Sequence, residues 1–225
     1  MSEATNPVTL LDPVALAIAA IARGEAVLVV DDEDRENEGD IIFAAQHSTP
    51  ALMGWTIRHS SGVICVPMDT AHADRLALPP MVRNNQDAKG TAYTVSCDAA
   101  AGVSTGISAT DRSLTATVLA NPTAMHDAVT RPGHMFPLRA VAGGVRQRPG
   151  HTEAAVELCR LAACETVAII AEVVDDGGEM VRLTGLREFA NQNNLILISI
   201  ADLVVFLALA GAAEPGADAV QGSLT

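Results

Sequence analysis

An apolar pentapeptide followed at once by a block of acids limits how this chain can fold. Residues 26–30 read AVLVV and residues 31–40 read DDEDRENEGD, in which seven of the ten side chains are carboxylates and one is Arg35. A continuous apolar run of this length, rich in valine, indicates a strand buried on both faces. Carboxylates this dense repel one another unless another charge offsets them. We therefore expect the acidic block to leave the end of a buried strand, where α/β-type folds bind ligands.

The remaining sequence alternates irregularly between strand-like and helix-like segments. Apolar runs typical of strands occupy 41–45, 62–66, 91–97, 166–174 and 195–200, with a hairpin predicted at 166–183. Helices are predicted near 14–21, 50–55, 71–77, 152–163 and 186–192, after the loop 102–112 and after 200, the first capped by Asp12. Two prolines and a glycine in RPGHMFPLRA (131–140) predict an irregular segment. This order favours an α+β fold with three α/β/α layers, in which helices cover both faces of a mixed, twisted sheet.

Length and composition favour one domain. The chain has 225 residues, of which 49% are hydrophobic, which is enough for a large core. We expect a single domain over 1–225, with a core at about 10–211 and a flexible C-terminal tail at 212–225. The net charge of −13 disfavours a nucleic-acid partner, because a basic stripe is needed to displace the counterions of phosphate groups.

Cysteine spacing and the apolar segments bear on location. The N-terminus lacks the basic region of a secretory signal, and the apolar window 195–213 carries Asp202 at its centre. We interpret that window as a strand followed by a helix rather than a membrane span. No CxxC pair is present, so we expect reduced thiols and a cytoplasmic protein. The four cysteines are Cys65, Cys97, Cys159 and Cys164.

The acidic block has two possible explanations. A charge run is typical of a solvated turn. However, its position after a buried strand, and the presence of Arg35 and Gly39 within it, favour a shaped backbone. Several carboxylates that converge suit a hard divalent cation such as magnesium, or a site that exchanges protons. We expect some of the seven acids to point inward and the others to lie on the surface.

Three further features carry candidate chemistry. Glu172 lies within the apolar run TVAIIAEVV, where it either faces water at an edge or serves in proton transfer. In RPGHTEA (148–154), an arginine, a glycine and a threonine at a helix start could bind phosphate, and His151 is either a metal ligand or a capping residue. His134 stands between two prolines, as a positioned acid or base or as a structural histidine. Cys65 is more typical of a core residue than of a nucleophile.

Together these stretches resemble the 3,4-dihydroxy-2-butanone 4-phosphate synthase family of riboflavin biosynthesis. The resemblance implies a lyase that converts D-ribulose 5-phosphate to L-3,4-dihydroxy-2-butanone 4-phosphate and formate, through a metal-stabilised enediolate, dehydration and skeletal rearrangement. It also implies Mg²⁺ or Mn²⁺, two ions per active site. The matching segments follow the family's order over most of residues 14–205: DDEDRENEGD, RHSSGVIC, TAYTVSCDAA, STGISATDR, RPGHMFPLRA, GHTEA and AEVVDDGGEM.

The resemblance further implies roles for individual residues. The metal ligands would be Glu36 and His151, and the catalytic residues would be His134 and Glu172. The implied substrate-binding residues are Arg35, Glu36, Asp40, Arg148, Pro149, Gly150, His151, Thr152 and Glu172.

The family pattern also bears on assembly. It implies a homodimer with active sites near the interface, in which His134 is offered to the neighbouring subunit. Because the family includes fusions with GTP cyclohydrolase II and no cysteine-rich zinc segment is present here, we expect the stand-alone form. One departure is Pro149, which removes an N–H group from the phosphate site. The group that takes the first proton stays open among Asp31, Asp40 and Glu172.

Two other functions compete with the synthase. One is a degenerate relative that binds a sugar phosphate without converting it, and the other is a magnesium-dependent transferase that uses nucleotides. The sequence lacks the glycine loop with lysine that typically binds nucleotide phosphates, which counts against the transferase. The intact set of implied functional residues counts against the inactive binder: Glu36, His134, His151 and Glu172.

Overall fold

The valine-rich run forms β1 (Val27–Val30), whose four side chains are all buried. The structure, a computed structural model, describes residues 10–212. β1 pairs antiparallel with β2 (Gly39–Ala44) and parallel with β7 (Ile196–Ser199). The acidic block is therefore the loop of a β-hairpin, and it begins where the buried strand ends, as the sequence predicts.

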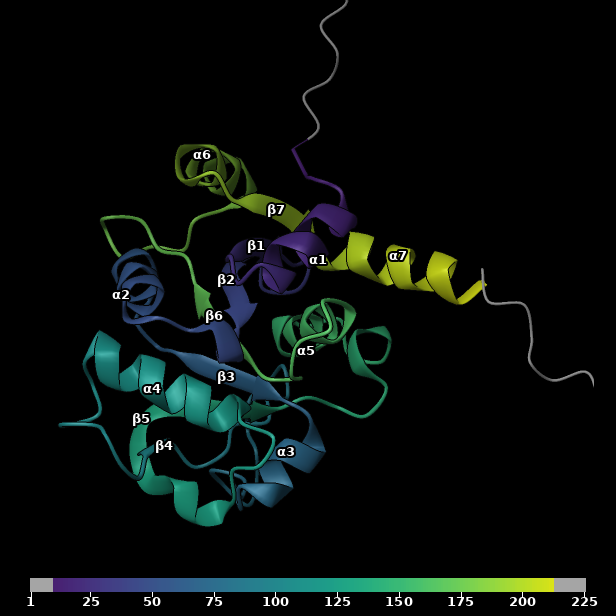
Figure 1. Ribbon diagram of the computed structural model, residues 1–225. Coiled ribbons are helices and arrows are strands. Elements are labelled where there is room, and N and C mark those ends of the chain that lie inside the picture. The colour runs from purple at the N-terminus through teal and green to yellow at the C-terminus, as the bar shows by residue number, and fades with distance from the viewer. Residues whose placement is uncertain (1–9, 213–225) are drawn as a thin grey trace, which may run out of the picture.

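The other described strands complete one mixed sheet. They are β3 (Cys65–Met68), β4 (Cys97–Ala99), β5 (Val129–Arg139) and β6 (Ala168–Glu172). The seven strands lie in the order β4-β5-β3-β6-β2-β1-β7 (Figure 1). Two pairs, β1 with β7 and β3 with β5, are parallel, and the other neighbours are antiparallel. The mixed sheet is confirmed.

Helices cover both faces of this sheet (Figure 1). The α-helices are α1 (Val14–Ala22), α2 (Pro50–His59), α3 (Thr70–Arg75), α4 (Ala109–Ala120), α5 (His151–Leu161), α6 (Leu183–Asn193) and α7 (Ile200–Ala212). Three short 3-10 helices are η1 (Ala45–His47), η2 (His126–Ala128) and η3 (Gly144–Arg146). Side chains of α1, α5 and α7 pack in one apolar core, and those of α2, α4 and α6 pack in the other.

Alternation along the strands assigns each side chain to one of these two cores. On β2, Ile42 and Ala44 face the layer of α1, α5 and α7, whereas Ile41 and Phe43 face the opposite layer. Because the strand repeat is two residues, Asp40 lies on the same face as Ile42, toward α5. This parity places the polar residues of β2 at the site described below.

Among the described helices, α2, α3 and α4 begin with a side-chain cap, whereas α1, α5 and α6 do not. The Thr49 hydroxyl accepts a hydrogen bond from the Leu52 N–H at 3.1 Å, as an N-cap residue does. The prediction that Asp12 caps α1 is wrong, since Pro13 occupies that position. The Asp12 carboxylate instead accepts hydrogen bonds from the Leu197 N–H and the Arg187 guanidinium, both at 2.8 Å, and so joins the chain before α1 to β7.

Two sequence predictions near β4 and β5 are also wrong. Residues 91–97 were expected to form a strand, but only Cys97 belongs to one, and Tyr93 and Thr94 make isolated bridges. Residues 131–140 were expected to be irregular, yet β5 is an 11-residue strand that includes them up to Arg139. Gly133 explains part of this result, because a Cβ there would lie 2.1 Å from the backbone of Cys97. A strand can therefore approach β4 closely at this point.

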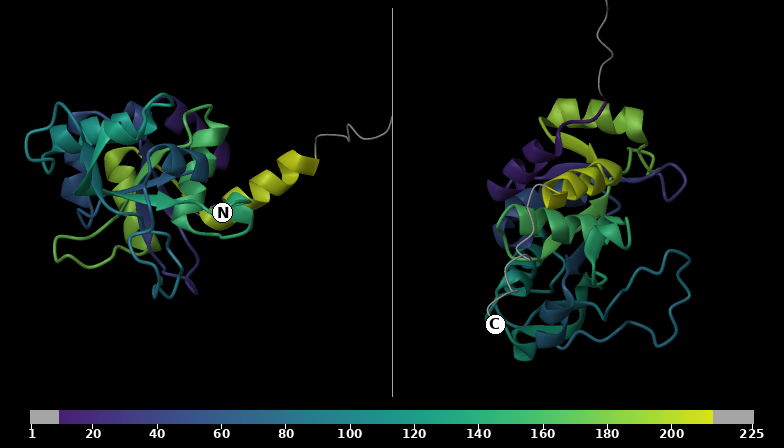
Figure 2. Two further views of the ribbon diagram at one scale, coloured as in Figure 1. Left: turned by 90° about the horizontal axis from the view of Figure 1, so that it is seen from below. Right: turned by 90° about the vertical axis from the view of Figure 1, so that its right-hand side faces the viewer.

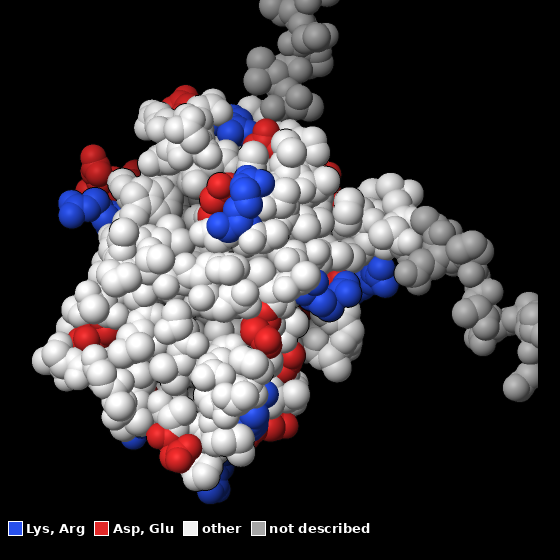
Figure 3. Space-filling model, in the orientation of Figure 1, with Lys and Arg blue, Asp and Glu red and all other residues white. Residues whose placement is uncertain are grey.

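The apolar segment at 195–213 divides into β7 and α7, as predicted. Among the described residues, no helix combines the length and apolar character that a bilayer span requires. α7 extends outward from the body of the molecule (Figure 2). Of the predicted tail at 212–225, residue 212 is the last residue of α7, and residues 213–225 lie outside the described part of the chain. Charged side chains are scattered over the face shown in Figure 3 rather than gathered in one basic patch.

Truncation of the largest buried side chain of β2 provides a test of the two-core arrangement. Phe43 is fully buried, so Phe43→Ala should lower the free energy of unfolding by about 3–5 kcal/mol through lost burial and a cavity. Val205→Ala on α7 is the control, because Val205 is 57% exposed and its loss should change that free energy by no more than about 0.5 kcal/mol. Urea denaturation measures both. Equal effects would contradict the assignment of Phe43 to the core.

Candidate active site

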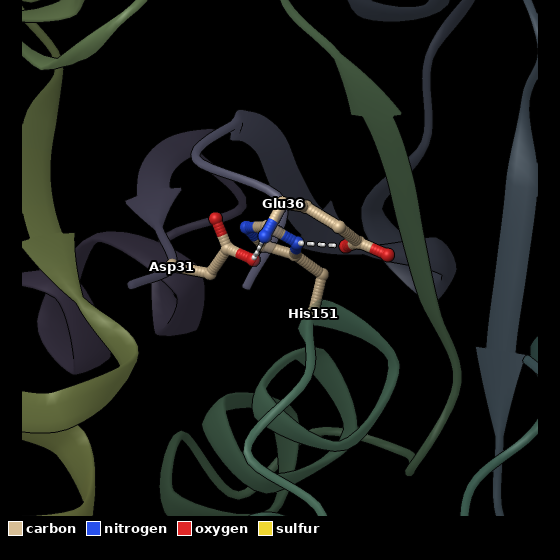
Figure 4. A group of neighbouring side chains, drawn as sticks. All are labelled: Asp31, Glu36 and His151. Carbon is tan, nitrogen blue, oxygen red and sulfur yellow. Dashed lines mark hydrogen bonds and ion pairs between the residues drawn. The ribbon is translucent and has the colours of Figure 1, made fainter. Parts of the chain in front are cut away.

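The candidate site lies where β1, β2 and β6 end beside the first turn of α5. Three side chains meet there, Asp31, Glu36 and His151, with one potential ligand atom of each within 4.8 Å of the others (Figure 4). Asp31 and Glu36 belong to the acidic hairpin, and His151 is the first residue of α5. The structure thus brings together segments that lie more than a hundred residues apart in the sequence.

Asp31 shapes the acidic hairpin. Its side chain is fully buried, and one carboxylate oxygen accepts from the Arg35 guanidinium at 2.8 Å and the Glu36 N–H at 3.1 Å. The other oxygen accepts from the Glu38 N–H at 2.9 Å. These bonds use the acceptor capacity of Asp31 for the loop itself. Asp31 is therefore better suited to holding the backbone than to binding a metal or moving a proton.

His151 presents one ring nitrogen to the acids. Its Nε2 donates a hydrogen bond to the Val29 carbonyl at 3.1 Å, so the neutral ring carries its lone pair on Nδ1. Nδ1 lies 4.0 Å from a Glu36 oxygen and 3.8 Å from an Asp40 oxygen. Burial lowers the pKa of His151, which favours this neutral ring. A neutral imidazole whose other nitrogen is held by a carbonyl is the form that binds divalent metals.

Asp40 and Glu172 face each other across the β2–β6 ladder. They are direct partners in the antiparallel register, so their side chains project from the same face. Asp40 is buried, and one of its oxygens has no hydrogen-bond partner. Glu172 is partly exposed, and its carboxylate accepts from the Ser61 hydroxyl at 2.7 Å. Of the two alternatives for Glu172, the structure therefore favours the functional end of the sheet over an outer edge strand.

The acids of this site lack enough positive charge. Burial, and then the charge of Glu172, raises the pKa of Asp40 well above its usual range. Burial and the charge of Glu36 also raise the pKa of Glu38. Both shifts have the direction expected when carboxylates crowd together in a low-dielectric environment. A divalent cation would offset this charge, and the unpartnered Asp40 oxygen and the free Nδ1 of His151 fit such an ion.

Most of the predicted site residues line one cavity of about 440 Å³, which includes space open to solvent. Those that line it are Arg35, Glu36, Asp40, Arg148, His151, Thr152 and Glu172. Gly150 is the N-cap of α5, and a Cβ there would lie 2.6 Å from the Arg148 guanidinium and 2.9 Å from that of Arg35. A larger residue would displace these guanidinium groups, so glycine allows both cations to lie close to the start of the helix.

The Arg148 guanidinium is also held by contacts within the protein. Its guanidinium contacts the buried Glu153 carboxylate at 2.6 Å and donates to the Thr91 hydroxyl at 3.2 Å. Pro149 points elsewhere, because it lines a neighbouring cavity on the outer side of the acidic hairpin. The exposed loop before Thr91 also reaches the site, since the Lys89 ammonium donates to the Arg35 carbonyl at 2.5 Å.

His134 does not line this cavity in the described chain. It lies on β5, with its side chain 40% exposed and its Nδ1 2.7 Å from Asp98. Cys65 does line the cavity, beside Tyr93. Burial raises the pKa of the Cys65 thiol far above its usual value, which disfavours the thiolate form and a nucleophilic role.

Sequence reasoning missed several residues that the fold brings to the site. Glu38, Thr91 and Tyr93 line the cavity, and Ser61 contacts Glu172. For Ser61 and Cys65 the signal was the segment HSSGVIC, whose serines precede a strand parallel to β5. For Thr91 and Tyr93 the signal was the family-like segment TAYTVSCDAA, although its alternation was mistaken for that of a regular strand.

The arrangement fits several known proteins. The model of the 3,4-dihydroxy-2-butanone 4-phosphate synthase family matches residues 15–206. The chain is 54% identical over 200 residues to the riboflavin biosynthesis protein RibBA of Rhodococcus jostii, covering 88% of this chain and 48% of that protein. The identity to RibBA of Nocardia farcinica is 55% over 200 residues, with the same coverage. The chain thus spans about half the length of the curated relatives it matches.

Solved structures agree with the sequence relatives. A crystal structure of 3,4-dihydroxy-2-butanone 4-phosphate synthase in complex with two magnesium ions matches with a TM-score of 0.87 and 46% identity, over 89% of this chain and 99% of that one. A two-domain synthase from A. baumannii, RibBX, matches with a TM-score of 0.83 and 38% identity, over 87% of this chain and 57% of that one. The fold, the site and these similarities lead to one conclusion: the chain belongs to the 3,4-dihydroxy-2-butanone 4-phosphate synthase family.

Proposed function

We propose that this chain converts D-ribulose 5-phosphate to L-3,4-dihydroxy-2-butanone 4-phosphate and formate, and thereby supplies the four-carbon unit of riboflavin. The observation that carries the proposal is the meeting of Glu36 and His151 beside the Asp40–Glu172 pair, in a cavity that also contains Arg148. A reaction with several proton transfers requires more than one titratable group close to the substrate. A cavity lined by carboxylates, an imidazole and guanidinium groups meets that requirement.

Glu36 and His151 are the proposed metal ligands. Glu36 keeps a partly exposed carboxylate that contacts Arg35, and His151 offers Nδ1. Asp31, although close, is occupied by the hairpin. A bound Mg²⁺ or Mn²⁺ would supply Lewis-acid polarisation of substrate oxygens. We propose two ions per site, because several acids line this cavity and a related synthase has been solved in complex with two magnesium ions.

The start of α5 is the proposed phosphate site. Gly150 makes no side-chain cap, so the first N–H groups of the helix are available to an anion. Arg148 and Arg35 flank that glycine, and the Thr152 side chain lines the same cavity. Pro149 lines a neighbouring cavity rather than this one, so it is not proposed as a contact of the phosphate group. Of the implied substrate-binding residues, we therefore retain Gly150 and Thr152 and set Pro149 aside.

Glu172 and Asp40 are the proposed proton carriers within the subunit. Burial and the charge of Glu172 raise the pKa of Asp40, which favours a protonated Asp40 beside Glu172. Such a pair can accept a proton from substrate carbon 1 and return one later. Asp31 is the weakest of the three candidates for the first base, since all its bonds serve the hairpin.

His134 enters this proposal through a second subunit. In the described chain it lies outside the cavity with a partly exposed ring, which supports a homodimer in which each subunit lends His134 to its partner. The alignment with the magnesium-bound synthase covers 99% of that chain. This match supports the proposal that a synthase domain of this size is active without a cyclohydrolase domain. Four free cysteines support a cytoplasmic location.

The central test of this function is a formate assay. The purified 225-residue chain, incubated with D-ribulose 5-phosphate and Mg²⁺, should release one formate for each substrate consumed. Glu172→Gln should reduce kcat by about 10²-fold or more if Glu172 carries a proton. Substrate binding without formate would favour the inactive binder instead.

Removal of one metal ligand should separate metal binding from folding. Mg²⁺ at about 100 times its Kd should raise the stability of the wild-type chain by about 2.7 kcal/mol, and Glu36→Gln should abolish most of this gain. Glu33→Gln is the matched control, because Glu33 is an exposed acid of the same hairpin that does not line the cavity. Thermal unfolding with and without Mg²⁺ measures both. Equal Mg²⁺ responses in the two variants would contradict Glu36 as a ligand.

Mixing two inactive variants tests the shared site. Glu36→Gln and His134→Gln should each be nearly inactive alone. In a mixed dimer one of the two sites would contain both wild-type residues, so re-equilibrated mixtures should recover about a quarter of the wild-type formate rate. A mixture as inactive as its components would contradict the exchange of His134 between subunits.

A further inference from the structure

A single carboxylate holds His134 at two points. One oxygen of Asp98 accepts from the His134 backbone N–H at 2.8 Å, and the other accepts from the ring Nδ1 at 2.7 Å. Asp98 is buried, whereas the His134 side chain is 40% exposed. The ring is therefore fixed from the protein side, and its Nε2 is left on the open side.

The backbone around this pair is shaped to allow the contact. The register of β4 against β5 shifts between Cys97, which pairs with Met135, and Asp98, which pairs with Thr130. In a regular antiparallel ladder Asp98 would pair with His134 instead. Gly133 permits the close approach, since a Cβ there would lie 2.3 Å from the Asp98 nitrogen. These features bring the Asp98 carboxylate to the residue that follows Gly133.

A glycine loop closes the other side of the pair. Gly106 has a φ of +96°, and a Cβ there would lie 2.1 Å from an Asp98 oxygen and 2.7 Å from the His134 Nδ1. The buried Asp111 holds this loop by accepting from the Gly106 N–H at 3.0 Å and from the Ser104 hydroxyl at 2.7 Å. The loop thus covers the Asp98–Nδ1 hydrogen bond.

We propose that Asp98 is the positioning residue of His134: it fixes the ring and keeps Nδ1 protonated, so that Nε2 of the neutral imidazole is the atom that accepts and returns a proton. This inference rests on the proposed function, in which His134 is catalytic. Within the described chain Asp98 does not line the cavity, and we assign its effect to the histidine that it holds. The same division of labour, in which a buried carboxylate selects the imidazole tautomer, operates in serine proteases.

The two-point contact makes Asp98→Asn a sharp test. The asparagine has one acceptor oxygen, which the backbone N–H of His134 requires, so its NH₂ group would face the ring Nδ1. An NH₂ group can only donate, which favours the tautomer protonated on Nε2. The variant should therefore keep KM near the wild-type value while kcat for formate release falls by about 10²-fold or more.

The chain contains a matched control. Asp69 also accepts from both the backbone N–H and the ring Nδ1 of a histidine, His72, at 2.8 and 3.1 Å, but it caps α3 and does not line the cavity. Asp69→Asn should leave kcat unchanged. The ¹⁵N shifts of the neutral His134 ring should report an Nδ1-protonated tautomer in the wild type and an Nε2-protonated tautomer in Asp98→Asn.

Three results would overturn the assignment. They are an Nε2-protonated wild-type ring, a kcat of Asp98→Asn within about tenfold of wild type, and an equally large effect of Asp98→Asn in a His134→Gln background. In that background we expect less than about a twofold further loss, because effects that act through one residue are not additive. If Asp98→Asn does not fold, the ¹⁵N measurement on the wild-type His134 ring alone tests the proposal. A wild-type chain that releases no formate would refute the proposed function, and the ring measurement would still test the Asp98 contact separately.

Discussion

The site depends on the bonds that one buried carboxylate makes inside the acidic hairpin. Asp31 accepts from the Arg35 side chain and from the backbone N–H groups of Glu36 and Glu38, so the hairpin has a definite shape despite its charge. A loop with six acids in eight residues would extend into solvent through charge repulsion if it lacked such an internal anchor. With it, Glu36 is held toward α5. Asp31 therefore fixes the backbone of the hairpin, and this leaves Glu36 available for binding.

Electrostatic imbalance is the second consequence of this geometry. The two cationic groups nearest the cavity are already engaged, Arg35 with the hairpin and Arg148 with Glu153. The remaining acids therefore face each other, and the raised pKa of Asp40 is the result. The arrangement costs stability unless a cation is bound or protons are shared. Both remedies would serve the proposed reaction, in which a ketose phosphate is bound through its oxygens and loses protons.

Much of this architecture could be predicted from the sequence, and the failures are local. The buried strand β1, the helix that begins at Pro50 and the helix after Gly150 follow from short-range patterns that hold wherever the segments lie. The convergence of Glu36 and His151 was inferred from family resemblance, since no local pattern encodes a contact across such a separation. β5 was missed because two prolines and a glycine suggest an irregular segment. In the structure these residues lie within a strand that still pairs with β3 and β4. The Asp98 contact requires the register shift in β4, which no single segment reveals.

The two-residue repeat of β2 and β6 has a consequence for how this fold can vary. Asp40 and Glu172 lie on the face of Ile42 and Ile170 because one residue separates each carboxylate from its core position on the same strand. A single-residue insertion or deletion between Asp40 and Ile42 would retain the ladder but carry the carboxylate into the opposite layer, among leucine and phenylalanine side chains. Length changes in this family should therefore accumulate in outer segments such as the exposed loop before Thr91, while these two strands keep their residue count even where their apolar side chains differ.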